Sequence, residues 1–245
     1  MPVRRFFAEI EEGKVILTGE DAHHIADVLR LAPGEQIIAC TGDGTDHVTE
    51  LTLVSGRQAE GRILRSVPSR GEPDVQITVF QGLPKGDKLE LIIQKAVELG
   101  AAAIVPVETR RSVAKVEEKK KQAKCARWNK IAEAAAKQSG RGRIPVVHPP
   151  VSFAEALEWM QQCNLPLAAY EEETTQTLKQ VLESNNRPRT VGVFIGPEGG
   201  IDPDEAARLR KADIPTITLG SRILRCETAP IALLSMLLYH YGEEA

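Results

Sequence analysis

The chain has 245 residues, 42% hydrophobic and 27% charged, with a formal net charge of −3, so it can bury a core as one large domain or two small ones. Its N-terminus lacks the apolar run of a signal peptide, and its longest strongly apolar stretch, 229–241, is too short to span a bilayer comfortably. Four scattered cysteines without C-x-x-C spacing and five histidines without metal-ligand spacing favour a cytoplasmic protein with reduced thiols and predict no structural metal.

Residues 1–70 have the pattern of a small β-rich domain. Short runs rich in β-branched residues are separated by Gly and Asp turns, which predicts strands. The expected strands are 15–18, 36–40, 48–54 and 61–64. A helix is expected over 19–30, and Asp43-Gly44 is the expected hairpin turn. The stretch 68–73 is rich in turn formers and is predicted to be a linker to a second domain, 74–245.

Strands and helices alternate after this linker, which predicts an α/β domain with a largely parallel sheet. The expected strands include 75–80, 103–107 and 165–170, and a long basic helix is expected over 115–138. Capping signals mark three helix starts, and Gly100 and Gly140 are placed to end two helices. The capping signals are Asp87 with Glu90, Ser152 with Glu155, and Asp202 followed by Pro203.

Two glycine-containing motifs near the C-terminus are the most informative part of the chain. Gly196-Pro197-Glu198-Gly199-Gly200 follows the apolar run 191–195, and the motif 219–229 precedes an apolar stretch that ends at Tyr241. Each motif joins an expected strand to an expected helix, where exposed backbone N–H and C=O groups can hold a small polar ligand. Neither motif matches G-x-G-x-x-G or a phosphate-binding loop. Together the two turns predict one shared pocket.

Charge is unevenly distributed along the chain. Residues 108–143 hold twelve Lys or Arg against four Glu, whereas residues 1–72 hold eight basic and twelve acidic side chains. A solvated helix face would explain Lys119-Lys120-Lys121, but four arginines at the ends of the basic segment favour a surface that binds nucleic acid. These arginines are Arg110, Arg111, Arg141 and Arg143.

Further motifs occur in order along nearly the whole chain. They are Arg-Arg-Phe-Phe at 4–7, His23-His24-Ile25, Lys85-Gly86-Asp87-Lys88, the segments 94–100 and 133–141, and the two glycine motifs. In this combination the chain resembles the bacterial small-subunit (16S) ribosomal RNA uridine-N3 methyltransferases of the SPOUT class. Gly-Pro-Glu-Gly-Gly alone occurs in other SPOUT enzymes, whereas its pairing with Arg-Ile-Leu-Arg-x-Glu-Thr-Ala and Gln-Ser-Gly-Arg is specific.

The resemblance implies a C-terminal trefoil-knotted SPOUT methyltransferase domain with a mostly parallel sheet, a small N-terminal β-barrel (PUA-like) domain, and S-adenosylmethionine as the cofactor. Three loops are expected around that cofactor. The implied cofactor-binding residues are Tyr170, Glu171, Ile195, Gly196, Gly200, Leu219, Gly220, Ile223 and Leu224. The expected partner is 16S ribosomal RNA within the small subunit. The expected RNA-binding residues are Arg4, Arg5, Arg30, Gln138, Arg141 and Arg143.

Methylation at N3 of uridine requires loss of a ring proton, so the site needs a base or cations that stabilise charge on the ring oxygens. The charged residues of the two motifs are Glu198, Arg222, Arg225 and Glu227, and the expected catalytic residues are Arg222, Arg225 and Glu198. For Glu198 and Glu227, hydrogen bonds that brace the loops are an equal alternative. The arginines are expected to contact substrate because a guanidinium can bind phosphate or uracil oxygens bidentately.

The helix expected over 231–239 is apolar nearly all round, which predicts burial on every face and hence a homodimer. Two other functions stay open. Another SPOUT activity, such as ribose 2′-O-methylation, would share the glycine motifs. A non-catalytic ribosome-binding factor could keep the fold with a vestigial pocket, although intact glycines in both motifs argue against it.

Overall fold

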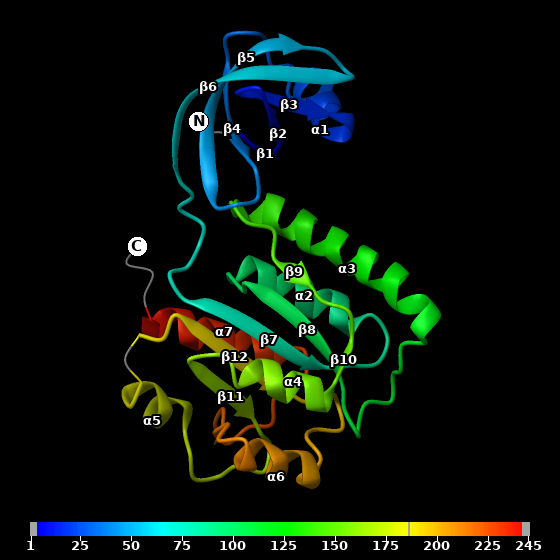
Figure 1. Cartoon of the computed structure of the whole chain (residues 1–245), viewed down its shortest axis with the longest axis vertical. Coiled ribbons are helices and arrows are strands. Elements are labelled where there is room, and N and C mark those ends of the chain that lie inside the picture. Colours follow the sequence, from blue (N-terminus) through cyan, green and yellow to red (C-terminus); the bar gives the residue numbers. More distant parts are fainter. Residues whose placement is uncertain (1–3, 186, 242–245) are drawn as a thin grey trace. The chain divides into compact units, whose positions relative to one another are not determined.

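Two separate β-sheets organise the chain in this computed structural model, which describes residues 4–185 and 187–241 (Figure 1). The chain divides into two units: residues 1–72 with 136–144, and residues 73–135 with 145–245. Each unit holds one sheet. Among the described residues, no helix is long and apolar enough to cross a membrane.

The first unit is built on a six-stranded sheet in the order β1-β4-β5-β6-β3-β2. Its elements are β1 (Arg5–Phe7), β2 (Glu9–Glu11), β3 (Lys14–Thr18), α1 (Gly19–His23) continued by a π-helical turn (His24–Val28), β4 (Gln36–Cys40), β5 (Thr45–Val54) and β6 (Gln58–Pro68). The four expected strands and the helical segment are confirmed. The strands β1 and β2 were not expected, because three residues are too few to show an alternating pattern.

The sheet of the first unit curls around its own small core. Register shifts in β5 at Val48/Thr49 and Leu51/Leu53 are the bulges that bend the strand. The buried side chains enclosed by the sheet and helix include Phe6, Leu17, Ile25, Ile37 and Leu51. Antiparallel pairing of β4 with β5 confirms the turn at Asp43-Gly44, where Gly44 has φ +91°.

The segment 136–144, which begins with the last turn of α3 (Glu118–Ser139), also belongs to the first unit. The Glu72 carboxylate accepts hydrogen bonds from the backbone N–H groups of Gly142 and Arg143, each at 2.9 Å, and from the Arg141 guanidinium at 2.7 Å. A Cβ on Gly71 would lie 2.9 Å from the Gly140 carbonyl oxygen. The stretch 68–73 is therefore not a free linker, because its end is bound to a distant part of the chain.

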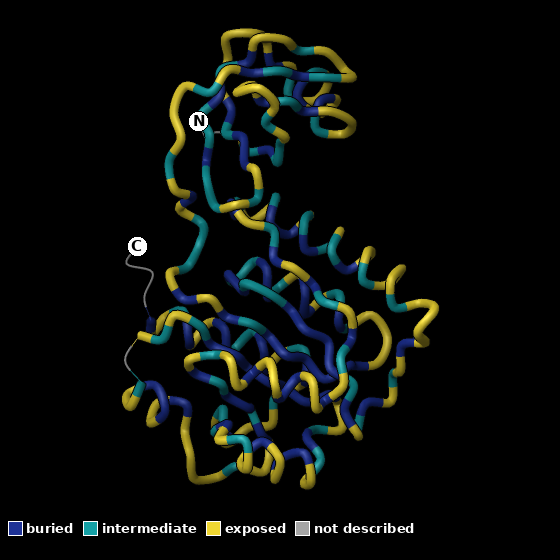
Figure 2. Tube along the Cα trace, in the orientation of Figure 1, coloured by how far each residue is buried: buried dark blue, intermediate teal, exposed yellow. Residues whose placement is uncertain are grey.

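The second unit is built on a parallel sheet in the order β10-β8-β7-β12-β11-β13, with β9 beside β8. Its strands are β7 (Gln76–Gly82), β8 (Ala103–Glu108), β9 (Val146–Val147), β10 (Val151–Ser152), β11 (Leu165–Ala169), β12 (Thr190–Ile195) and β13 (Thr216–Ile217). All described strand pairs of this sheet are parallel, which confirms the α/β prediction. The central strands are buried over most of their length, β12 from Val191 to Ile195 and β7 from Val79 to Gly82 (Figure 2).

Six helices accompany this sheet within the described residues. They are α2 (Lys88–Glu98), α3 (Glu118–Ser139), α4 (Phe153–Met160), α5 (Leu178–Glu183), α6 (Pro203–Lys211) and α7 (Thr228–Tyr241). Side chains of α4 and α6 share a core with one face of the sheet, including Phe80, Phe153, Phe194 and Leu209. The helices α2 and α7 pack against each other on the other side (Figure 1).

The helix caps test the sequence signals directly. The capping box of Ser152 and Glu155 is formed, and Asp202 caps α6 with Pro203 in its first turn. The capping box expected at Asp87 and Glu90 is wrong. Asp87 has φ −94° and ψ 9°, outside the extended conformation of an N-cap residue, and its side chain accepts no cap hydrogen bond.

The helix α5 was not expected, although a signal for it is present in the sequence. Thr177 and Gln180 form a complete capping box at its start. This is the same S/T-x-x-E/Q pattern that marks α4. The helix is short, so its apolar residues alone show no clear helical period.

Candidate active site

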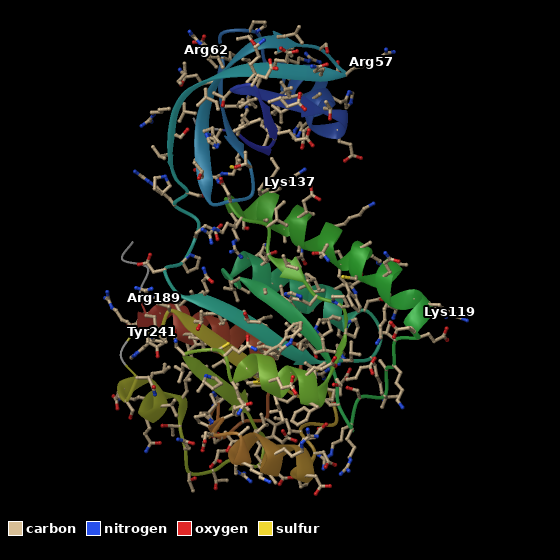
Figure 3. The ribbon with its side chains drawn as sticks, in the orientation of Figure 1. Arg57, Arg62, Lys119, Lys137, Arg189 and Tyr241 are labelled. Carbon is tan, nitrogen blue, oxygen red and sulfur yellow. The ribbon has the colours of Figure 1, made fainter. Side chains whose placement is uncertain are left out.

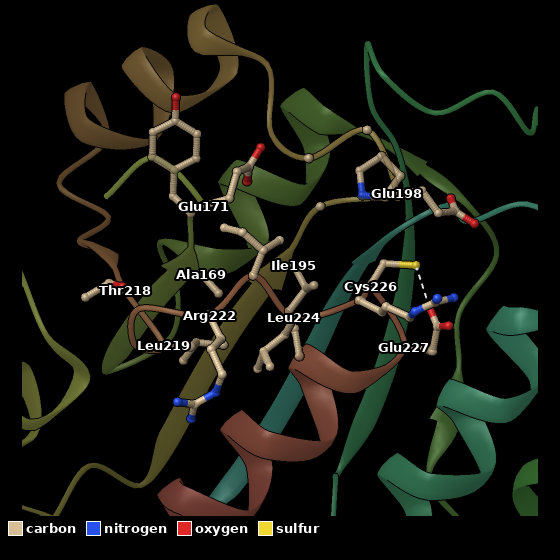
Figure 4. Close-up of a pocket in the computed structure, with 18 of the residues that line it drawn as sticks. Ala169, Glu171, Ile195, Glu198, Thr218, Leu219, Arg222, Leu224, Cys226 and Glu227 are labelled. Atoms are coloured by element: carbon tan, nitrogen blue, oxygen red, sulfur yellow. Dashed lines mark hydrogen bonds between the residues drawn. The ribbon is translucent and has the colours of Figure 1, made fainter. Parts of the chain in front are cut away.

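The expected pocket is present at the ends of three neighbouring strands. Because β11, β12 and β13 are parallel, the loops that follow them emerge at the same edge of the sheet, with Ala169 in register with both Ile195 and Ile217. These loops and the start of α7 enclose a cavity of about 470 Å³ (Figure 4), within the range typical of small-molecule sites. All nine residues that the resemblance assigns to the cofactor line this cavity, together with Glu198, Arg222 and Arg225.

The loop 196–200 folds tightly on itself, and this explains its glycines. A Cβ on Gly196 would lie 2.8 Å from the backbone carbon of Gly200, closer than real Cβ contacts allow. Gly200 has φ +73°, and a Cβ there would collide with the carboxylate of Glu171. The buried side-chain amide of Gln81 donates a hydrogen bond to the Gly196 carbonyl oxygen at 3.2 Å. The loop is thus held in one conformation with its backbone toward the cavity.

Glu171 fastens the loop after β11 to the glycine loop. Its carboxylate accepts a hydrogen bond from the Ile201 backbone N–H at 3.0 Å. Arg111 donates to the Gly199 carbonyl at 2.9 Å and lies 3.8 Å from Glu171. The three contacts hold the two cofactor-side loops together, so Glu171 shapes the cavity as well as lining it.

One wall of the cavity is apolar. Ile195 is buried, while Leu219 and Leu224 are partly exposed toward the cavity, as expected for an apolar slot. Ile223 differs, since its side chain is 77% exposed and stands at the rim. The Tyr170 ring is buried, and burial together with the hydrogen bond that its hydroxyl donates to Glu172 raises the pKa of Tyr170 to about 12. Tyr170 is therefore a neutral wall residue.

The opposite end of the cavity is a charged cluster centred on Lys88. Its ammonium lies 3.2 Å from Glu198 and 3.3 Å from Glu227. Hydrogen bonds to Glu198 raise the pKa of Lys88, against a smaller lowering effect of desolvation, and Glu227 adds to the rise. Lys88 was not expected at the site. It belongs to the Lys85-Gly86-Asp87-Lys88 motif, which is the signal that could have indicated it.

Glu198 is bound on both oxygens. The Lys85 backbone N–H donates to Oε1 at 3.1 Å and to Oε2 at 3.2 Å, in addition to the Lys88 contact. Burial alone would raise the pKa of Glu198, but hydrogen bonds from its own backbone N–H, from Lys85 and from Lys88 lower it overall. These contacts join the loop before α2 to the glycine loop, which is the bracing role that the sequence left open.

Arg222 and Arg225 line the cavity and are exposed. Within the described part of the chain, neither guanidinium has a carboxylate partner, whereas Lys88 takes up the contacts of Glu198 and Glu227. Arg225 is held by its backbone, because its carbonyl accepts from Thr228 and Ala229 at the start of α7. The two guanidinium groups are thus available to an anionic ligand.

Known proteins share both the sequence and the architecture of this chain. Residues 71–238 match the RNA methyltransferase domain family, and residues 17–64 match the RNA methyltransferase PUA domain family. Ribosomal RNA small subunit methyltransferase E of Bacillus subtilis is 40% identical over 97% of this chain and 96% of the relative. The chain belongs to the ribosomal RNA small subunit methyltransferase E family.

Solved structures of this family share the fold. Ribosomal RNA small subunit methyltransferase E from Neisseria gonorrhoeae, bound to S-adenosyl methionine, aligns with a TM-score of 0.83 at 31% identity, covering 99% of this chain and 100% of the other. A Legionella pneumophila protein in complex with the bound cofactor SAM aligns with a TM-score of 0.82 at 29% identity, covering 97% of each chain.

The residues expected to bind RNA fall into two groups. Arg4, Arg30, Gln138 and Arg143 are exposed in the first unit. Arg5 is instead bound to Asp46 at 2.5 Å, and Arg141, with 4% of its side chain exposed, is bound to Glu72. Exposed arginines can meet phosphates directly, whereas the two bound arginines stabilise the unit.

The basic segment 108–143 is also less available to RNA than its charge count suggested. Arg110 is bound to Asp202 and Asp204 at the start of α6, and its backbone N–H donates to Glu205. Lys119 at the start of α3 does project from the ribbon (Figure 3). Among the described residues, no group of three or more His, Cys, Asp or Glu side chains could hold a metal ion.

Proposed function

We propose that this protein transfers a methyl group from S-adenosylmethionine to N3 of a specific uridine in 16S ribosomal RNA of the small ribosomal subunit. One observation carries the proposal: both glycine motifs line a single cavity that also holds the exposed guanidinium groups of Arg222 and Arg225. A cofactor pocket and groups for an anionic substrate are thereby joined at one site.

The cavity fits S-adenosylmethionine in chemistry. The backbone of the 196–200 and 219–224 loops offers N–H and C=O groups to its polar parts, and the apolar wall at Ile195, Leu219 and Leu224 offers a slot for its adenine. The cofactor would supply an electrophilic sulfonium methyl. Three carboxylates, Glu171, Glu198 and Glu227, line the cavity with three cationic side chains, Lys88, Arg222 and Arg225. The charges of the lining are therefore balanced, and the site offers anions to the sulfonium and cations to an anionic substrate.

The chain's own contribution to the reaction is positioning and charge. Methyl transfer needs the methyl carbon and the acceptor nitrogen aligned, and the proposed role of the braced loops is to hold the two reactants in that alignment. We propose that Arg222 and Arg225 contact the uracil oxygens or an adjacent phosphate and stabilise the negative charge that develops on the ring. Glu198 has both oxygens bound, so its proposed role is to brace the glycine loop.

The exposed cations of the first unit support an RNA substrate. Arg4, Arg30 and Arg143 would contact phosphates, with Gln138 as a further polar contact. We propose the assembled small subunit as the substrate, which places the protein in the cytoplasm. The trefoil knot that the resemblance implies is part of the same proposal.

We also propose a homodimer formed through α7. Leu233, Leu234 and Leu237 of this helix are buried within the chain, but Met236 is 38% exposed and Tyr239 is 91% exposed. An apolar helix with one exposed face is typical of a subunit interface. Sedimentation at micromolar concentration is expected to give a dimer, and a monomer there would contradict this part of the proposal.

Mass-spectrometric mapping of methylated nucleotides tests the function. Undermethylated small subunits incubated with the protein and S-adenosylmethionine should gain one base methylation, at N3 of a uridine. A methyl group on a ribose 2′-oxygen would identify the other SPOUT activity. Binding of small subunits without S-adenosylmethionine affinity in calorimetry would identify a non-catalytic ribosome-binding factor.

A further inference from the structure

Three carboxylates line the cavity, and their oxygen atoms are used differently. Both oxygens of Glu171 lie within hydrogen-bond distance of the Ile201 backbone N–H, at 3.0 and 3.3 Å. Both oxygens of Glu198 accept from the Lys85 backbone N–H. These two carboxylates therefore hold loops together, and neither has an oxygen free of such contacts for a ligand.

Glu227 is different because only one of its oxygens is engaged by other residues. Oε2 accepts from the Cys226 thiol at 3.2 Å and lies 3.3 Å from the Lys88 ammonium. Among the described residues, no group of another residue donates a hydrogen bond to Oε1. The side chain is only 17% exposed and stands at the charged end of the cavity with Cys226 and Glu198 (Figure 4).

The neighbours of Glu227 keep it ionised. The hydrogen bond from Cys226 lowers the pKa of Glu227, as do its own backbone N–H and the Lys88 ammonium. Lys88 uses its ammonium for the two carboxylates and has three N–H donors in total, so one remains for a ligand. The cavity thus presents an open acceptor, Glu227 Oε1, beside an open cationic donor.

With N3 of the base placed at Glu227, as methylation at N3 requires, this arrangement matches the Watson–Crick edge of uracil and opposes that of cytosine. Uracil presents an N3–H donor between two carbonyl acceptors, whereas cytosine N3 is itself an acceptor next to an amino donor. A carboxylate can accept from the uracil N3–H but would face a lone pair on cytosine N3. Unpaired or opposed polar groups in a dry site give strong discrimination between such substrates.

We propose, resting on the proposed function, that Glu227 is the general base of the methyl transfer and that Glu227 with Lys88 selects uracil over cytosine. As the N3–C bond forms, the N3 proton passes to Glu227 Oε1 and the electrons of that N–H bond stay on nitrogen. The C–S bond breaks with its electron pair on sulfur, which removes the sulfonium charge. The protonated Glu227 then loses its proton to water when the product leaves.

Glu227→Gln tests the proposal, because glutamine keeps the size of the side chain and cannot take up the proton. The variant should methylate uridine about 10²-fold or more slowly than the parent protein, with S-adenosylmethionine affinity within a few-fold by calorimetry. Its rate should rise about tenfold per pH unit across the neutral to alkaline range, because the substrate must then lose the N3 proton by itself. Glu198→Gln is the comparator, and its rate should fall less and keep the parent pH profile.

A substrate with cytidine in place of uridine tests whether Glu227 acts as a general base or only as a structural residue. On small subunits that carry cytidine at the mapped position, N3 needs no deprotonation, and the amide that Glu227→Gln introduces can donate to it. The ratio of cytidine to uridine methylation should therefore rise about 10²-fold or more in Glu227→Gln. Uridine activity within threefold of the parent, with an unchanged pH profile and base preference, would overturn the proposal.

Two further controls keep the outcomes distinct. If Glu227→Gln does not fold by circular dichroism, Glu227→Asp retains the carboxylate and should keep the parent pH profile at a lower rate. A shifted profile in that variant would contradict the role of Glu227 as base. If the parent protein places no methyl group on a base nitrogen, the proposed function is wrong. That result is distinct from a change of rate in the Glu227→Gln variant.

Discussion

Two arginines of the first unit, Arg5 and Arg141, and the two arginines of the pocket have opposite surroundings. Arg5 and Arg141 are nearly buried and bound to Asp46 and Glu72. Arg222 and Arg225 are exposed beside a cavity and have no carboxylate partner in the described chain. All four are expected functional residues in the sequence, yet only the second pair is free to meet a ligand.

The difference follows from the cost of burying charge. A guanidinium removed from water needs a partner of opposite charge, so the folded chain supplies one wherever an arginine is enclosed. An arginine at a cavity rim stays hydrated and carries no such requirement. A positive charge counted along the sequence is therefore not yet a charge available to RNA.

The largest expected effect is on the stability of the first unit. Glu72→Ala removes the carboxylate that the Arg141 guanidinium and the N–H groups of Gly142 and Arg143 share. Removing one partner of a buried ion pair typically costs about 3–5 kcal/mol, so the free energy of unfolding should fall by about that amount in urea titration. Arg4→Ala, at an exposed position, is the control and should change it by less than about 0.5 kcal/mol. Equal small effects in both variants would remove the distinction between bound and exposed arginines.

The second largest expected effect is on the turnover rate when a pocket arginine is removed. Arg225→Ala should lower the turnover rate about 10²-fold, since loss of one group that stabilises transition-state charge commonly costs that much. Calorimetry should show S-adenosylmethionine affinity within a few-fold of the parent, because the guanidinium serves the substrate. A folded, dimeric variant with nearly full activity would make Arg225 a structural residue like Arg141.

The salt dependence of RNA binding distinguishes the exposed arginines from those bound to a carboxylate. Binding to small subunits should weaken steeply as salt rises, because phosphate contacts release counterions. Arg30→Ala and Arg143→Ala should each reduce the slope of log affinity against log salt by about 1. Arg5→Met should leave the slope unchanged provided that the variant folds. A reduced slope for Arg5→Met would show that the guanidinium leaves Asp46 to bind phosphate.

The smallest expected effect is on the pKa of the Glu173 carboxylate, in the loop after β11. Hydrogen bonds from the Thr216 hydroxyl, and then from Thr175, lower the pKa of Glu173 to about 2. Because the pKa is lower in the folded state, this stabilisation is present above the unfolded pKa and is lost as pH falls toward about 2. Thr216→Val should raise the pKa of Glu173 in an NMR titration and shift the loss of stability to higher pH. No change in that pKa would contradict the hydrogen-bond explanation.

Much of the fold was predictable because local signals have local causes. The strand 36–40, the capping box at Ser152 and the glycine that ends α3 all depend on residues within a few positions of one another. The pocket was predictable for a related reason. Parallel strands bring their following loops to one edge, so two glycine motifs after such strands had to lie near each other.

One failed prediction is local, and one residue that was missed depends on contacts between positions distant in sequence. Asp87 has the right spacing for a capping box, but its backbone conformation excludes the cap. Lys88 lies far along the chain from Glu198 and Glu227, and only folding brings its ammonium between their carboxylates. No spacing in the sequence relates these three positions.

The sequence by itself determined the two kinds of sheet, the glycine loops and the set of charged residues available for chemistry. Only the tertiary structure decided which of those charges are neutralised and which remain open. Ion pairs such as Arg141 with Glu72 join positions far apart in the chain, and their formation depends on distances that only folding sets. Arg225 and Glu227 both line the cavity, and Arg225 has no carboxylate partner among the described residues, so a substrate can contact both side chains there.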